Sequence, residues 1–312
     1  MKNGRPSRAA AMAQAQWNLK AIVEELRNSR EVAHNVRPLG RIRELPSRET
    51  IGNVIDGLAA ALFPTHHGHS DLTDESIDFF VGETLNTALT LLSEQVRRGL
   101  LFGDGKHEAK HDPGAAPLAA QAIEIVRAFA SQLPSLRALL VSDLQAAYKG
   151  DPAATSISEI LLCYPGVAAV MNYRFAHALH RLGALLIPRL VTEIAHSRTG
   201  IDIHPGAEIG PSFFIDHGTG VVIGETTIIG QHVRLYQAVT LGAKRFEVDA
   251  DGALLKGGPR HPIVEDDVVI YAGATILGRI TIGRGSTIGG NVWLTQNVPP
   301  GSNITQAQMR RD

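Results

Sequence analysis

An aliphatic residue recurs every six positions through the last third of the chain, and this period constrains the fold more than any other feature. A helix of 3.6 residues per turn would spread such side chains around its surface. Short strands joined by tight corners would instead turn them all into one narrow core, so the period predicts a parallel β-helix with coils of about eighteen residues. The series is regular except at two places: the interval from Ile215 to Ile223 is two residues too long (the slip), and the interval from Leu241 to Val264 contains an insertion. Its members are Ile203, Ile209, Ile215, Ile223, Ile229, Leu235, Leu241, Val264, Ile270, Ile276, Ile282, Ile288 and Leu294.

The residues before Thr199 have a helical pattern instead. Apolar side chains recur at helical spacing over 71–98, 120–129, 134–148, 167–182 and 188–198, and a polar Gly/Pro stretch at 103–117 predicts a loop. The sequence therefore predicts an α+β protein. We expect an all-helical N-terminal domain over 1–198, with 1–50 as an extension, a β-helix over 199–300, and a short tail over 301–312. The polar insertion predicts an arm at about 243–262 that leaves the β-helix.

Composition limits the kinds of partner that the chain can have. With 30 basic and 31 acidic side chains, the net charge of −1 gives no electrostatic basis for binding nucleic acid or an anionic membrane. No apolar run approaches the roughly 18 residues of a membrane span. Cys163 is the one cysteine, which excludes an internal disulfide and fits a reducing compartment. We therefore expect a cytoplasmic protein with no nucleic-acid or membrane partner.

Asp216 and His217 follow an inward-pointing residue of the repeat and immediately precede its slip. Asp202 also lies beside an inward position, fifteen residues earlier, which is close to one coil length. We therefore expect Asp202 and His217 to lie near one another on adjacent coils. A carboxylate that holds one imidazole nitrogen leaves the other free to accept a proton, as in a general base. The spacing alone leaves open that both are surface residues without a role.

Arg260 and His261 end the polar insertion, between two prolines, in the sequence PRHP. Proline stiffens the backbone around a cation and an imidazole, which suits carboxylate recognition or stabilisation of an oxyanion. The alternative is an ordinary polar loop end.

A metal site is not expected, although the chain contains clustered histidines. Hexapeptide-repeat carbonic anhydrases bind zinc through three histidines, two of them only a few residues apart. None of the histidines in the predicted β-helix lie that close: His204, His217, His232 and His261. The THHGH stretch (His66, His67, His69) falls in a predicted loop of the helical domain. The chain also contains no P-loop, and GTGVVIGE is not followed by the helix of a dinucleotide-binding loop.

Several longer motifs resemble the serine acetyltransferases over about residues 140–300. These motifs are DLQAAYKGDPA (143–153), YRFAHALH (173–180), IDIHPGAEIG (201–210), IDHGTGVVIGE (215–225), VTLGA (239–243) and GGPRHP (257–262). The resemblance implies a helical domain followed by a left-handed β-helix, assembled as a homotrimer or as a dimer of trimers. It implies acetyl transfer from acetyl-CoA to L-serine, which gives O-acetylserine and CoA in the first step of cysteine biosynthesis, and feedback inhibition by L-cysteine.

The resemblance also implies a role for individual residues. His217 matches the general base, and Asp202 matches the carboxylate that orients it. Asp151 and Asp216 match the carboxylates that hold the substrate ammonium, Arg260 matches the cation for the substrate carboxylate, and His261 matches a second active-site histidine. Acetyl-CoA would lie in a groove between neighbouring subunits, along positions that include Ala243, Ala272, Gly273 and Gly290. No acyl-enzyme is implied.

The chain departs from the best-known enterobacterial pattern at three places. The arm between Leu241 and Arg260 is longer, and Thr287 stands where that form has a lysine. The sequence ends in ITQAQMRRD, without the terminal isoleucine that inserts into O-acetylserine sulfhydrylase, so we do not expect a stable complex with that enzyme. Two alternatives stay open: a hexapeptide-repeat O-acetyltransferase for a sugar or xenobiotic hydroxyl, and a non-catalytic CoA-binding scaffold.

Overall fold

The computed structural model describes residues 17–34, 44–101, 115–245, 252, 254, 255 and 257–306. Its elements fall into two compact units. Helix α2 (Leu19–Asn28) and the π-helix η1 (Ser29–Ala33) belong to the first unit. Every other described helix and strand belongs to the second unit, which also carries all the candidate site residues.

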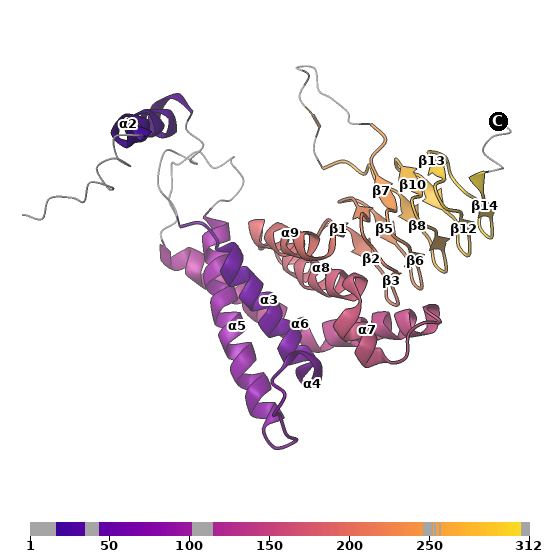
Figure 1. Cartoon of the computed structure of the whole chain (residues 1–312), viewed down its shortest axis with the longest axis horizontal. Helices are drawn as coiled ribbons and strands as arrows, with labels where there is room; N and C mark the ends of the chain where they lie inside the picture. The colour runs from indigo at the N-terminus through magenta and orange to yellow at the C-terminus, as the bar shows by residue number, and fades with distance from the viewer. Residues whose placement is uncertain are drawn as a thin grey trace, which may run out of the picture. The chain divides into compact units, whose positions relative to one another are not determined.

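Seven described helices of the second unit precede its strands (Figure 1). Serine hydroxyls cap two of them: Ser47 accepts from the Thr50 N–H at 3.1 Å, and Ser156 accepts from the Glu159 N–H at 3.1 Å. Across the part of the chain that the structure describes, no helix is both long and apolar enough to cross a bilayer. The helices are α3 (Arg48–Leu62), α4 (Pro64–His67), α5 (Ile77–Leu100), α6 (Ala115–Gly150), α7 (Ile157–Cys163), α8 (Pro165–Arg181) and α9 (Leu186–Thr199).

Three of the predicted helical segments were wrong in their bounds. The helix predicted over 71–98 begins only at Ile77, because Thr73 and Ser76 form a turn in which the Ser76 hydroxyl accepts from the Thr73 N–H at 2.9 Å. The segments 120–129 and 134–148 form one helix, α6, which continues through Pro134. Proline removes one helical hydrogen bond, but buried side chains before and after Pro134 pack into one core and keep α6 continuous. Of the predicted loop, residues 103–114 lie outside the described residues.

Fourteen short parallel strands in the described chain form the three faces of a left-handed β-helix (Figure 1). The first face consists of β1 (Asp202–Ile203), β4 (Val222–Ile223), β7 (Thr240–Gly242), β10 (Thr275–Leu277) and β13 (Trp293–Leu294). The second consists of β2 (Glu208–Ile209), β5 (Ile228–Ile229), β8 (Ile263–Val264) and β11 (Thr281–Ile282). The third consists of β3 (Phe214–Ile215), β6 (Arg234–Leu235), β9 (Val269–Ile270), β12 (Thr287–Ile288) and β14 (Asn303–Ile304).

The aliphatic series of the sequence forms the core of this β-helix, which confirms the predicted fold. Twelve of its thirteen members are buried, and Ile209 is partly buried. Each aliphatic pairs with another across neighbouring coils, as Ile223 does with Leu241 and Leu241 with Ile276. Each buried aliphatic side chain stabilises the fold by about 1.5–3 kcal/mol relative to an exposed one, so the repeat explains why such short strands hold together.

The first coil contains the slip, and the slip exposes His217. Asp202 pairs with Val222 on the next coil, and Val222 pairs with Thr240 on the coil after that. The first of these two steps along the sequence is two residues longer than the second. The extra length lies at His217 (φ 60°) and Gly218 (φ 89°), where a side chain in place of Gly218 would overlap Ile201. Left-handed backbone is strained for a residue other than glycine and costs about 1–3 kcal/mol, and such strain is concentrated at functional sites. At the same corner, residues with positive φ form a regular column from coil to coil, and His217 is not part of that column. The column consists of Gly200, Gly220, Ala238, Gly273 and Asn291.

A buried ion pair docks the first coil on the helices. Arg174 of α8 contacts Asp143 of α6 through two hydrogen bonds of 2.8 and 2.9 Å, and both side chains are almost wholly buried. Arg174 also donates to the main-chain oxygens of Ile209 and Gly210, and Asp143 accepts from the Phe213 N–H at 2.9 Å. These bonds fix β3, and with it Asp216 and His217, against the end of α6.

Candidate active site

Asp216 and His217 lie at the corner between the third and first faces, directly after β3. The His217 side chain is 72% exposed, whereas Asp216 is buried. The imidazole Nε2 lies 3.9 Å from Asp216 Oδ1. A fixed carboxylate therefore lies beside an imidazole that a substrate can reach.

Arg234 of β6, on the next coil along the chain, holds Asp216 in place. Its Nη2 donates to Asp216 Oδ2 at 2.7 Å. The guanidinium lies over the rings of Phe214 and Tyr236, at 5.1 and 4.6 Å from their centroids, so its position is fixed on two sides. The other oxygen, Oδ1, is left facing His217.

Asp151 adds a second carboxylate to this corner from the end of α6. Its Oδ2 accepts from the Tyr164 hydroxyl at 2.6 Å, and its Oδ1 accepts from the Ala153 N–H at 2.8 Å. The Tyr164 hydrogen bond, followed by that of Ala153, lowers the pKa of Asp151, and the charges of Arg234 and His217 lower it further. The same contact raises the pKa of Tyr164 to about 12. Asp151 is therefore anionic at neutral pH, and it lies near enough to Arg234 and His217 for their charges to act on it.

Arg260 and His261 lie at a different corner, between the first and second faces. The Arg260 guanidinium pairs with Glu225 at 2.5 Å, and Arg260 is partly exposed. His261 is buried, and its ring packs against Gly224, where any side chain would overlap it. Burial, followed by the charge of Arg260, lowers the pKa of His261 to about 4. His261 is therefore neutral at physiological pH, and Arg260 supplies the positive charge.

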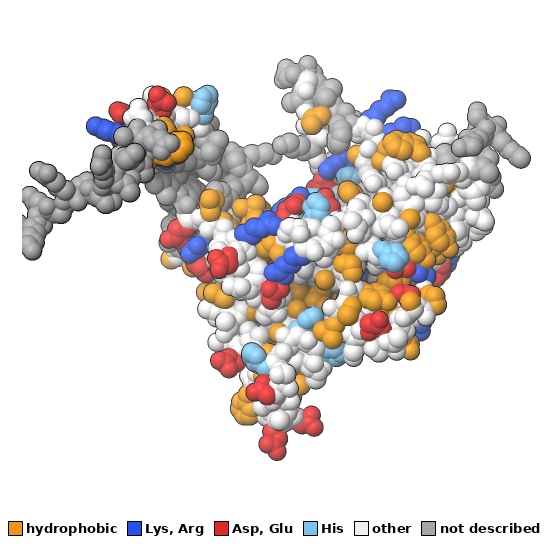
Figure 2. Space-filling model, viewed as in Figure 1, with side chains coloured by type: hydrophobic (Ala, Val, Ile, Leu, Met, Phe, Trp, Pro, Cys, Tyr) orange, Lys and Arg blue, Asp and Glu red, His pale blue; other side chains and the backbone are white. Residues whose placement is uncertain are grey.

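The two groups are separate within one copy of the chain. No hydrogen bond or ion pair between described residues joins the corner of Asp151, Asp216 and His217 to the corner of Arg260 and His261. On the face seen in Figure 2, acidic and basic side chains are interspersed. Each corner also contains an ion pair, Arg234–Asp216 at the first and Arg260–Glu225 at the second. Asp151 leaves the first corner with an excess of negative charge, and Arg279 leaves the second with an excess of positive charge.

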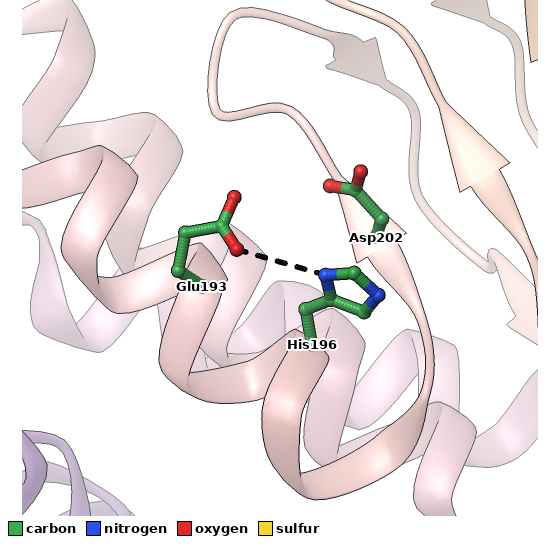
Figure 3. A group of neighbouring side chains, drawn as sticks. All are labelled: Glu193, His196 and Asp202. Carbon is green, nitrogen blue, oxygen red and sulfur yellow. Dashed lines mark ion pairs between the residues drawn. The ribbon is translucent and has the colours of Figure 1, made fainter.

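Asp202 does not pair with His217 in this structure, which corrects the expected contact. Its carboxylate faces the last turns of α9, where it lies with Glu193 and His196 (Figure 3). The ligand atoms of these three residues lie within 4.8 Å of one another, and His196 Nδ1 lies 3.6 Å from Glu193 Oε2. The slip explains the difference: the residue paired with Asp202 is Val222 rather than a residue near His217. The proposed roles of Asp202 and His217 stay predictions.

Three of the four predicted CoA-groove positions stack at the corner of His217. Ala272 accepts a hydrogen bond from the Asn291 N–H at 2.9 Å, Gly273 has a φ of 72°, and a side chain at Gly290 would lie 3.1 Å from the Ala272 oxygen. Ala243 instead follows β7, at the corner of Arg260. All four of these small residues are partly exposed.

Among the described residues, the one cluster of three possible metal ligands is Glu193, His196 and Asp202. None of the histidines singled out in the sequence belongs to it. Arg189 donates to Glu193 Oε1 at 2.8 Å, so one oxygen of the cluster is already engaged.

Sequence reasoning missed the residues that position those it found. Arg234 and Tyr164 hold the two carboxylates, and Glu225 and Thr226 contact Arg260 and His261. One signal was available for Arg234, because it follows Asp216 by about one coil length. The others depend on contacts between segments that no spacing in the sequence reveals.

Residues 261–296 match the family described as Bacterial transferase hexapeptide (six repeats). Together with the three-faced β-helix and the polar corners, this match defines a hexapeptide-repeat acyltransferase. A relative from Synechococcus elongatus named "Serine acetyltransferase, plasmid" is 56% identical over 300 residues, which cover 95% of this chain and 93% of the relative. The chain belongs to the serine acetyltransferase family.

Solved structures agree with this assignment. The chain is similar to Entamoeba histolytica serine acetyltransferase 1 in complex with L-cysteine, with a TM-score of 0.70 and 37% identity over 85% of this chain and 88% of that chain. It is also similar to soybean serine acetyltransferase complexed with serine, with a TM-score of 0.51 and 31% identity over 84% of this chain and 98% of that chain.

Proposed function

We propose that the chain transfers the acetyl group of acetyl-CoA to the L-serine hydroxyl at a site completed by two neighbouring copies of a homotrimer. The observation that carries this proposal is the separation of charge between two corners. One corner offers the carboxylates of Asp151 and Asp216 beside His217, and the other offers Arg260 beside His261. Serine carries one ammonium and one carboxylate, so the two corners complement its two charges. Threefold packing of the β-helices would bring a corner of one copy against a different corner of the next.

His217 would act as the general base that removes the serine hydroxyl proton as the oxygen attacks the thioester. Asp202 would orient it when substrate is bound, since catalytic hydrogen bonds are often incomplete without a ligand. In the structure the Asp202 carboxylate lies with Glu193 and His196, so this role requires it to turn toward His217 when substrate binds. Attack is direct, and the proton passes from His217 to the leaving CoA sulfur. Neutral His261 would donate a hydrogen bond within the same site.

Acetyl-CoA would lie in the groove between copies, along the small residues Ala243, Ala272, Gly273 and Gly290. L-cysteine shares the ammonium and carboxylate of serine, so it would bind the same two corners and inhibit. Pairing of trimers into a hexamer would use the helical region over 1–198, which we propose as a domain distinct from the catalytic β-helix over 199–300.

The test is CoA release from acetyl-CoA, which should require L-serine. Arg260→Ala should raise the serine KM by about 10–100-fold, because it removes a charge-assisted hydrogen bond to the substrate carboxylate. The KM for acetyl-CoA should stay unchanged. Arg284→Ala is the matched control, since Arg284 is 66% exposed and pairs with Asp266 away from both corners.

The same assay separates the alternatives. A sugar or xenobiotic acceptor lacks an amino-acid head group, so its KM should be insensitive to Arg260→Ala. A non-catalytic scaffold should bind CoA and assemble without releasing thiol. Absence of serine-dependent CoA release by the wild-type chain would contradict the proposal.

A further inference from the structure

Thr226 joins the end of the arm to the wall of the β-helix through an unusual concentration of hydrogen bonds. Its hydroxyl oxygen accepts from the Arg260 N–H at 2.9 Å and from the His261 N–H at 3.1 Å. The same hydroxyl lies 2.9 Å from His261 Nδ1. Because both lone pairs accept from main-chain N–H groups, the hydroxyl proton is free to donate to the imidazole.

The main chain of Thr226 determines which nitrogen of His261 carries the proton. Its N–H donates to His261 Nδ1 at 3.1 Å. A main-chain N–H can only donate, so Nδ1 must be the unprotonated nitrogen, and the proton of the neutral ring lies on Nε2. The low pKa of His261, caused first by burial and then by Arg260, agrees with a neutral ring. Arg279 adds a second attachment, since its Nη1 donates to the main-chain oxygens of Thr226 and His261.

We propose that Thr226 is a positioning residue of the serine site: it fixes Arg260 and His261 at the end of the arm and sets His261 in the tautomer that donates from Nε2. This inference rests on the proposed function, in which both residues bind the substrate. It explains how a substrate-binding pair can stand at the end of a long insertion and keep a defined geometry. The main-chain N–H groups of Arg260 and His261 and the ring of His261 are all hydrogen-bonded to Thr226, so this end of the arm has little conformational freedom.

The neighbouring residue provides a matched control for the test. Thr227 is fully buried, and its hydroxyl is one of the few buried side-chain atoms of the described residues without a hydrogen-bond partner. Thr226→Val and Thr227→Val therefore make the same chemical change at adjacent positions. Thr226→Val removes the three hydrogen bonds of the Thr226 hydroxyl, whereas Thr227→Val removes no hydrogen bond between described residues. Thr226→Ser keeps the hydroxyl and should restore function.

The experiment measures kcat and KM for L-serine and for acetyl-CoA in the full-length chain. Thr226→Val should raise the serine KM about tenfold, with a smaller change in kcat and no change in the KM for acetyl-CoA. Thr226→Ser and Thr227→Val should resemble the wild type, and Thr227→Val should unfold at an equal or higher temperature. In an Arg260→Ala background, Thr226→Val should raise the serine KM by a smaller factor than in the wild type, because the part of its effect that acts through Arg260 is lost and only the part through His261 remains.

Two outcomes would overturn the inference while leaving the proposed function intact. One is equal kinetics for Thr226→Val and Thr227→Val in a wild-type background that is active on serine. The other is full additivity of Thr226→Val with Arg260→Ala, which would mean that Thr226 does not position Arg260. An inactive wild-type chain would instead contradict the proposed function itself.

Discussion

Replacing His217 with alanine is expected to lower kcat for serine-dependent CoA release by about 10²–10⁴-fold, which is the usual contribution of a general base. The imidazole is largely exposed at the corner where the carboxylates of Asp151 and Asp216 gather. No other described histidine of the same copy lies at this corner. The serine KM should change far less than kcat, because in the proposed site Asp151, Asp216 and Arg260 would still hold the head group.

His232→Ala is the matched control for this variant. His232 is also exposed, has a φ of 56°, and lies 3.4 Å from Asp267 at the corner between the second and third faces. Both substitutions place alanine in the same left-handed region, so they share any backbone effect. His232→Ala should leave kcat unchanged. A loss below tenfold for His217→Ala would show that His217 only positions substrate, and an equal loss for both variants would trace the effect to the left-handed backbone rather than to the His217 imidazole.

Replacing Arg174 with methionine should lower the free energy of unfolding by about 3–5 kcal/mol. The change keeps most of the side-chain volume but leaves Asp143 buried without its cation, and it removes the donors to Ile209 and Gly210. Burial already raises the pKa of Asp143. Without Arg174 this pKa should rise further, so the folded chain would hold a proton that the unfolded chain releases. The stability of the variant should therefore fall as the pH rises above the ordinary aspartate pKa of about 3.9.

The measurement is urea unfolding at fixed protein concentration, at pH 5 and at pH 8. Arg127→Ala is the control, because the Arg127–Glu124 pair is 68% exposed on both sides and should contribute at most about 1 kcal/mol. If Arg174→Met lowers the free energy of unfolding no more than Arg127→Ala does, the Arg174–Asp143 ion pair does not dock the first coil. A loss that does not depend on pH would contradict the role assigned to Asp143.

The β-helix could be predicted from the sequence because its cause is local and repeated. Each inward position must be aliphatic, and a period of six excludes a helix. The helical region was predicted less well, since the ends of its helices depend on side-chain contacts. The turn at Thr73 and Ser76 delays α5, and packing carries α6 through Pro134.

The site could be predicted only in part. The residues proposed for its chemistry lie where the repeat is broken: His217 at the slip and Arg260 at the insertion. Their partners could not be found in this way. Asp202 lies fifteen residues before His217, but the slip lengthens the coil, and α9 presents His196 to Asp202 instead. Thr226 and His261 meet only because the arm returns to its own coil.

The division of the site between two copies can be tested most directly by mixing subunits that are each defective at one corner. His217→Ala and Arg260→Ala chains, each with a different affinity tag, would be co-expressed and purified through both tags. Every mixed trimer would contain one site with both wild-type corners, so kcat/KM for serine should return to about a third of the wild-type value. If mixed trimers form but stay as inactive as their parents, both corners must act within one chain, and the account of a shared site is wrong.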